Sequence, residues 1–101
     1  MHTEIKRIAD TLKLLANETR LQILCLLIEQ PYHVGALCKA LSGVSQSALS
    51  QNLALLKACG MVVDRRAGQT VTYAIADARV EQVIAMLKHI YCDAPANLSA
   101  Q

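Results

Sequence analysis

Residues 45–63 read SQSALSQNLALLKACGMVV, and this stretch contains the pattern on which the fold depends. Ser45 is a favoured helix N-cap, and the leucines that follow recur every three or four positions, as one face of a helix requires. Gly60 is a typical helix stop, because glycine readily adopts the left-handed conformation that ends many helices. The β-branched Val62 and Val63 come directly afterwards. The stretch therefore predicts a helix from Ser45 to Gly60 that leads at once into a strand.

A second β-rich stretch, Val71-Thr72-Tyr73-Ala74-Ile75, lies a few residues further on. The segment between the two, Arg65-Arg66-Ala67-Gly68-Gln69, carries two arginines and a glycine. Two short β-rich runs around such a segment favour a hairpin. We therefore expect a β-hairpin with a basic tip that holds Arg65 and Arg66.

Amphipathic helices are expected on both sides of this helix and hairpin. Asn17 is a favourable N-cap for the second helix, and Pro31 ends it. The apolar residues at helical spacing are Ile5, Ile8, Leu12 and Leu15 in the first helix, Leu21, Leu24, Cys25 and Ile28 in the second, Val34, Leu37, Cys38 and Leu41 in the third, and Val80, Val83, Ile84, Leu87, Ile90 and Tyr91 in the last.

The expected order is α-α-α-α-β-β-α, a mainly α fold with one β-hairpin. Such an order is that of a winged helix-turn-helix with a helix added at each end. Residues 1–93 form this single domain, and residues 94–101 are expected to be a flexible tail with little to bury. The whole chain is short, at 101 residues, and 53% of it is apolar without any Phe or Trp. Its core must be aliphatic, and its size favours a homodimer.

Several classes of protein are excluded by the composition. No apolar run approaches the roughly 20 residues of a membrane span, and the N-terminus lacks the apolar core of a signal peptide. We therefore expect a cytoplasmic protein with reduced thiols and no membrane contact. No nucleophile-elbow, P-loop or H-E-x-x-H motif occurs, and no His neighbours a cysteine. An enzyme is therefore not expected, and no cofactor is implied.

The net charge of +2 is concentrated in the middle of the chain. Residues 31–76 hold four basic residues against Asp64 alone, a net +3, and a nucleic-acid-binding surface needs such an excess. The outward side of the predicted helix 45–60 carries Ser and amide side chains, which can bond to base edges in the major groove. The candidate DNA-binding residues are Ser45, Gln46, Ser47, Ser50, Gln51 and Asn52 in the helix and Arg65, Arg66 and Gln69 in the hairpin.

Each of these features alone favours a solvated polar helix face or an ordinary charged turn. Their combination, in this order along the chain, favours double-stranded DNA as the partner. A winged helix used only for protein contacts is the alternative, and the polar Ser/Gln face argues against it.

Four segments together resemble the ArsR/SmtB family of bacterial winged-helix repressors, over about four fifths of the chain from Leu12 to Tyr91. They are ANETRLQIL at 16–24, SQSALSQNL at 45–53, the run 56–62 and the wing GQTVTY at 68–73. The resemblance implies a homodimer built through the first and last helices, which represses promoters until it senses an inducer. Asn52 stands where the family often has His, and the turn Ser42-Gly43-Val44 is one residue longer than usual.

Metal sensing, common in the family, is not expected here. The four cysteines form no C-x-x-C pair, and His33-Val34-Gly35 replaces the family's Cys-x-Cys motif. The other family site would use the last helix. Asp77 and Asp93 fit two of its positions, but Arg79 and Ile90 occupy the others, and a guanidinium cannot bind zinc.

Cys25 and Cys92 resemble the dithiol of the sulfide-responsive HlyU/BigR subgroup. That resemblance implies a sequence-specific repressor whose operator binding is switched by oxidation or persulfidation of this pair, with reactive sulfur species or oxidants as inducer. Alternatively, Cys25 is only a small buried hydrophobe, and the repressor is constitutive or responds to a metal or another ligand. Cys38 and Cys59 match no sensing position and are expected to be structural packing residues.

Overall fold

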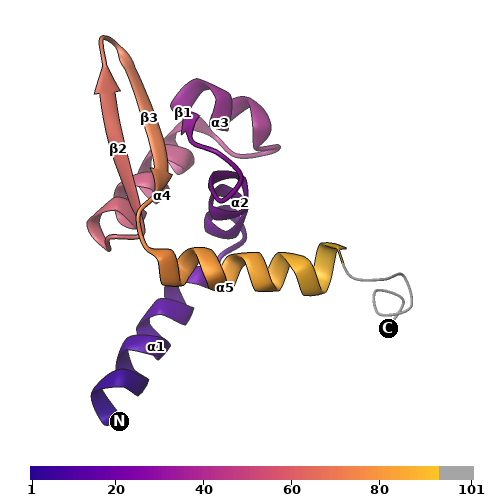
Figure 1. The fold of residues 1–101 in the computed structure, drawn as a ribbon. Helices are drawn as coiled ribbons and strands as arrows, with labels where there is room; N and C mark the ends of the chain where they lie inside the picture. Colours follow the sequence, from indigo (N-terminus) through magenta and orange to yellow (C-terminus); the bar gives the residue numbers. More distant parts are fainter. Residues whose placement is uncertain (94–101) are drawn as a thin grey trace.

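The computed structural model describes residues 1–93, so the predicted tail 94–101 lies outside the described part of the chain. The fold is mainly helical with a small sheet and has the predicted winged helix-turn-helix order (Figure 1). The elements are α1 (His2–Leu15), α2 (Glu18–Leu27), β1 (Tyr32–His33), α3 (Val34–Ala40), α4 (Gln46–Ala58), β2 (Val62–Ala67), β3 (Thr70–Ile75), α5 (Ala78–Lys88) and the π-helical segment η1 (His89–Asp93).

Two helix starts and one helix end follow the predicted chemistry. The side-chain oxygen of Asn17 accepts a hydrogen bond from the backbone N–H of Arg20 at 3.0 Å, and Ser45 Oγ accepts one from Ala48 N–H at 3.1 Å. After α4, Gly60 adopts a positive φ of 78°, and the N–H of Met61 reaches back to the carbonyl of Leu56 at 2.9 Å. This left-handed cap turns the chain directly from α4 into the hairpin.

The sheet has three antiparallel strands in the order β1-β3-β2, one more than predicted. The extra strand, β1, has only two residues, and these pair with Tyr73 and Thr72 of β3. A strand of two residues is too short to show an alternating sequence pattern. Only its pairing with β3 identifies it as a strand.

The two arginines that were expected at the tip of the hairpin lie elsewhere in it. Strand β2 continues to Ala67 and β3 begins at Thr70, so Arg65 and Arg66 lie within β2, opposite Thr72 and Val71. Only Gly68 and Gln69 remain between the strands, and Gly68 has a positive φ of 62° that suits a tight turn. Because neighbouring residues of a strand point to opposite faces, the two arginines project from opposite sides of the hairpin.

The core is aliphatic, as the composition predicted, and among the described residues no polar side chain is buried. Helix α4 contributes its whole apolar stripe and packs on α2 and β2. The fully buried side chains are Ile23, Leu24, Leu37, Leu49, Leu53, Leu56 and Ile84. With that stripe buried, the opposite side of α4 faces solvent.

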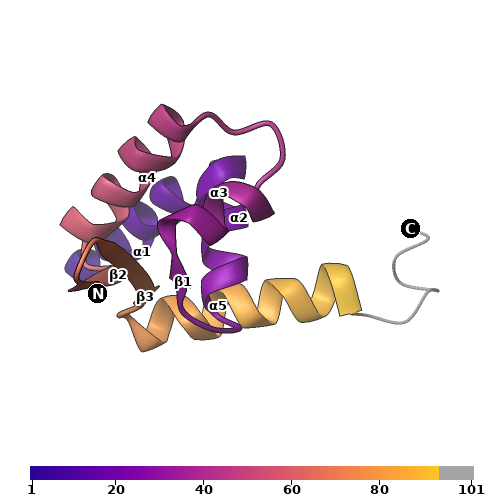
Figure 2. The ribbon, with the colours of Figure 1, turned by 90° about the horizontal axis from the view of Figure 1, so that it is seen from above.

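The two end helices bury much less of their apolar surface. In α5 only Val80 and Ile84 are buried, and in α1 only Leu15 is. Helix α1 projects away from the rest of the domain beside the start of α5, at the end opposite the hairpin tip (Figure 1). Seen from above, α4 lies on one side of the molecule and α5 runs along another (Figure 2). The regular α-helix at the C-terminal end stops at Lys88, three residues short of the predicted Tyr91.

Candidate nucleic-acid interface and thiol pair

The predicted base-reading side chains gather on the solvent face of α4. Gln46, Ser47, Ser50 and Gln51 are all exposed at its N-terminal half, and α4 contains no acidic residue. Ser45 is exposed as well, but its hydroxyl oxygen serves as the helix cap. The arrangement presents hydroxyl and amide groups beside the positive end of a helix dipole, which suits phosphates and base edges.

Asn52 differs from its neighbours, because both of its polar atoms are bonded within the protein. Its carbonyl oxygen accepts a hydrogen bond from Arg20 Nη1 at 3.1 Å, and its Nδ2 donates to the carbonyl of Ala48 at 2.8 Å. Arg20 Nε also donates to the carbonyl of Leu14 at 2.6 Å. Asn52 therefore links α4 to α2 and to the end of α1, and its predicted contact with DNA stays a prediction.

Sequence reasoning did not predict that Arg20 bonds to Asn52. Arg20 was visible only as one charged residue of a capped helix, thirty-two positions before Asn52. No local pattern connects the two residues, since the packing of α2 on α4 alone brings them together.

The hairpin carries unneutralised positive charge. Arg65, Arg66 and Gln69 are exposed, and neither arginine side chain makes an ion pair or hydrogen bond with the rest of residues 1–93. Asp64, the one acid of the 31–76 segment, is held by Lys57 of α4 at 3.1 Å. That ion pair ties the base of the hairpin to α4 and leaves the arginine charges available to an anionic partner.

Cys25 of the predicted switch lies in α2, which packs on α5, and Cys92 lies in η1, the segment that continues α5. Cys25 is half-buried in α2, whereas Cys92 is exposed in η1, and both are free thiols. Burial raises the pKa of the Cys25 thiol, and the nearby charges of Cys92 and Glu29 raise it further, whereas Lys88 lowers it.

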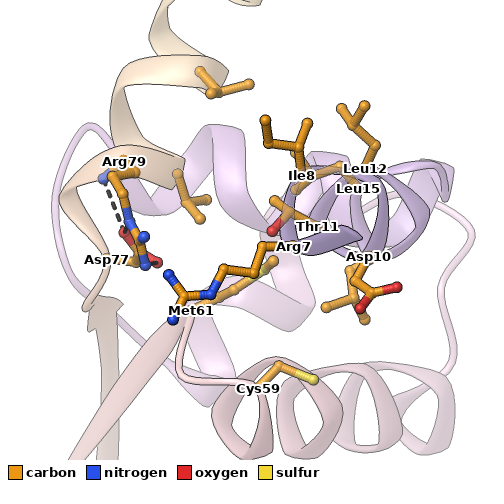
Figure 3. A pocket seen from close by; sticks show the side chains of 13 residues that line it. Arg7, Ile8, Asp10, Thr11, Leu12, Leu15, Cys59, Met61, Asp77 and Arg79 are labelled. Carbon is orange, nitrogen blue, oxygen red and sulfur yellow. Dashed lines mark hydrogen bonds and ion pairs between the residues drawn. The ribbon is translucent and has the colours of Figure 1, made fainter. Parts of the chain in front are cut away.

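The other two cysteines were both expected to be packing residues, but only one of them is. Cys38 is partly buried and packs against the core, as predicted. Cys59 is exposed at the C-terminal end of α4, so the expectation that it is a packing residue was wrong. At the C-cap of α4, Cys59 lines a hollow between α1 and α5 (Figure 3).

Residues at the family's metal positions are engaged in helix caps. The Nδ1 atom of His33 accepts a hydrogen bond from Ala36 N–H at 3.1 Å and caps α3. Asp77 caps α5 and pairs with Arg79 at 3.1 Å, and this hydrogen bond from Arg79 holds the pKa of Asp77 below its usual range. Within residues 1–93, no three His, Cys, Asp or Glu side chains gather as a metal site would require.

A hollow of about 650 Å³ lies between α1 and the first half of α5 (Figure 3). Ile8 and Leu12 of α1 border it on one side, and Val80 and Val83 of α5 on another. The apolar surface continues beyond the hollow, since Ile5 of α1 is 54% exposed and Met86 of α5 is 59% exposed. None of the helices in the described part of the chain is long and apolar enough to cross a membrane.

Comparison with known proteins gives consistent matches. A profile described as "Bacterial regulatory protein, arsR family" matches residues 17–63. The transcriptional activator HlyU of Vibrio cholerae is 47% identical over 83 residues, which cover 82% of this chain and 76% of HlyU. A solved structure of HlyU from that organism has a TM-score of 0.86 at 42% identity, covering 91% of this chain and 99% of that one.

Two further solved structures agree in fold. The transcriptional repressor BigR of Xylella fastidiosa has a TM-score of 0.81 at 32% identity, covering 92% of this chain and 91% of BigR. A homodimeric winged helix-turn-helix DNA-binding domain from Mycobacterium bovis has a TM-score of 0.73 at 36% identity, covering 86% of this chain and 80% of that domain. The chain therefore belongs to the arsR family of bacterial regulatory proteins, in its HlyU/BigR-like subgroup, and is a DNA-binding transcriptional regulator rather than an enzyme.

Proposed function

We propose that this regulator is a cytoplasmic homodimeric repressor whose binding to operator DNA is switched by a Cys25–Cys92 dithiol. The observation that carries the DNA-binding half is the exposed, acid-free polar face of α4 beside the unpaired arginines of β2. Gln46, Ser47, Ser50 and Gln51 would read base edges in the major groove. Arg65, Arg66 and Gln69 would contact the phosphate backbone or the adjacent minor groove.

The homodimer is supported by the apolar surface that α1 and α5 expose. Covering this surface with a second copy removes it from water, which stabilises the dimer by roughly 25 cal/mol for each Å² buried. The homodimeric domain from Mycobacterium bovis supports the same assembly. Two α4 helices related by a two-fold axis would enter successive major grooves about 34–36 Å apart, so the operator should be a pseudo-palindrome.

The switch is supported by the packing of α2, which carries Cys25, on α5, which continues into the η1 segment that carries Cys92. An organic trisulfide, RSSSR, can serve as oxidant. The exposed Cys92 thiolate attacks its central sulfur and expels RS⁻, which leaves Cys92–S–S–SR. The Cys25 thiolate then attacks that central sulfur and expels the second RS⁻, so the product is a Cys25–S–S–S–Cys92 bridge. The trisulfide is reduced to two thiolates as the two cysteines are oxidised.

The bridge would alter the position of α2, on which the reading helix α4 packs. If the bridged dimer spaces its two α4 helices less favourably, operator affinity falls by the difference in binding free energy, commonly about 1–3 kcal/mol. HlyU is described as an activator and BigR as a repressor, so relatives regulate in both directions.

A shift assay with genomic fragments, combined with peptide mass spectrometry, tests this proposal. Reduced protein should retain a small set of fragments, and trisulfide treatment should release them as Cys25 and Cys92 become linked. Cys25→Ser and Cys92→Ser should each abolish the response, whereas Cys38→Ser should respond like wild type. A Cys92→Ser variant that still responds fully would exclude the dithiol, and failure to retain any fragment would exclude sequence-specific binding.

A further inference from the structure

An ion pair joins the two helices that carry the proposed switch. Lys88, the last residue of α5, donates a hydrogen bond to Glu29, which lies two residues beyond the end of α2. Glu29 follows Cys25 by four residues, and Cys92 follows Lys88 by four. The ion pair therefore joins the end of α2, about one turn after Cys25, to the end of α5, about one turn before Cys92.

We propose that this ion pair tunes the reactivity of Cys25, with Lys88 favouring the thiolate and Glu29 opposing it. The inference rests on the proposed thiol switch and adds the residues that set how readily its buried thiol reacts. Lys88 and Glu29 act through Cys25 and do not themselves react.

The location of Lys88 makes its charge effective. Its side chain is only 26% exposed, whereas that of Glu29 is 53% exposed. A charge that is partly withdrawn from water is less screened, so Lys88 acts on its neighbours more strongly than a solvated lysine would. Lys88 lowers the pKa of Cys25, while burial, Cys92 and Glu29 raise it, and the net effect is a raised pKa.

In the described part of the chain, the charged groups that act on Cys25 are Lys88 of α5, Cys92 of η1 and Glu29 just beyond α2. Cys25 also lines a second hollow, on the other side of which lie Ala40, Leu41 and Ser42, none of which titrates near neutral pH. Within α2 itself, Glu18 lines this second hollow two turns before Cys25.

Electrostatic tuning and a merely structural clamp predict different outcomes. Replacing either partner breaks the ion pair, so a clamp would loosen in both variants and expose Cys25 in both. Tuning predicts opposite signs, because Lys88→Met removes the charge that favours the thiolate and Glu29→Gln removes one that opposes it. Methionine also keeps an apolar stem of similar length against the helix surface.

The measurement is the alkylation rate of Cys25 by iodoacetamide between pH 6.5 and 9.5, followed by peptide mass spectrometry. A Cys92→Ser background is used so that no bridge can form. The Cys25 thiolate displaces iodide and forms a thioether, so the rate reports the thiolate fraction. At pH 7.5, Lys88→Met should slow alkylation about twofold or more, and Glu29→Gln should speed it. Lys88→Arg should restore the original rate, and 1 M salt should shrink the differences.

The matched control is Lys57→Met, which breaks the ion pair between α4 and β2 and should leave the rate unchanged. Circular dichroism identifies any variant that has not folded. If Lys88→Met does not fold, the alkylation rates of Lys88→Arg and Glu29→Gln still test the proposal. Equal rates in all variants, or faster alkylation in both Lys88→Met and Glu29→Gln, would overturn the proposal. The assay contains no DNA, so its result is separate from the failure or success of the operator switch.

Discussion

Helices α4 and α5 both carry an apolar stripe, but α4 buries its stripe within the domain, whereas α5 leaves much of its apolar surface exposed. Helix α4 buries Leu49, Leu53 and Leu56 within its own domain and presents hydroxyl and amide groups to solvent. Helix α5 buries Val80 and Ile84 but leaves Val83, Met86 and Leu87 exposed. A helix whose apolar side is buried and whose exposed side is polar suits a polar ligand such as DNA. A helix with an exposed apolar side suits a second protein surface.

The largest expected effect tests the buried side of α4. Leu49→Ala should lower the free energy of unfolding by about 2–5 kcal/mol, because it removes a fully buried side chain and leaves a cavity. Leu55→Ala, on the same helix but 38% exposed, is the control and should cost far less. Urea denaturation measures both. Equal losses would mean that the stripe of α4 is not the core of the domain.

The exposed side of α5 can be tested by adding a charge. Met86→Asp should weaken the homodimer by about 2–3 kcal/mol, because an apolar side chain buried on association is replaced by a carboxylate. Sedimentation analysis measures the dissociation constant. Ser50→Asp adds the same charge to α4 and should leave the dimer intact while it weakens DNA binding by phosphate repulsion. A Met86→Asp protein that remains dimeric would place the interface elsewhere.

A smaller effect is expected from the hydrogen bond that links α4 to α2. Asn52→Ala should lower the free energy of unfolding by about 1–2 kcal/mol, because it leaves Arg20 without one hydrogen-bond acceptor. Gln51→Ala removes a neighbouring solvent-facing amide and should leave stability unchanged while it reduces discrimination between operator sequences. If Asn52→Ala instead left stability unchanged and altered sequence preference, Asn52 would be a base reader.

The smallest effect concerns the wing. Arg65→Ala and Arg66→Ala should each weaken DNA binding in a sequence-independent way and reduce the slope of log affinity against log salt by about 1. Arg79→Ala, an exposed arginine of α5, should leave that slope unchanged. Fluorescence anisotropy across a salt series measures the slopes. Identical slopes for wild type and the two wing variants would argue against phosphate contacts by the hairpin.

Local chemistry predicted much of the fold. Asn17 and Ser45 cap helices as their types and positions indicated, and Gly60 ends α4 through the left-handed conformation that glycine permits. Features that depend on tertiary pairing were not predictable in this way. Strand β1 exists because it pairs with β3, and pairing with β3 also extends β2 through Arg65 and Arg66.

In the candidate site, too, some features are predictable from a local pattern and others depend on tertiary packing. Exposure of Ser47 and Gln51 follows from the helical period, because they lie opposite the leucine stripe, and Ser50 lies at the edge of that exposed side. Gln46 is exposed as the first residue of α4. The bonds of Asn52 to Arg20 and of Lys88 to Glu29 span 32 and 59 positions and depend on how helices pack. No pattern within one segment contains that information.

The operator affinity of one protein sample through a redox cycle tests the central claim most directly. Fluorescence anisotropy with a retained genomic fragment would be measured on reduced dimer, after trisulfide treatment, and again after dithiothreitol. The account predicts a loss of about 5–150-fold on bridging and full recovery on reduction. Unchanged affinity, in protein whose Cys25–Cys92 link is verified by mass spectrometry, would contradict the thiol switch.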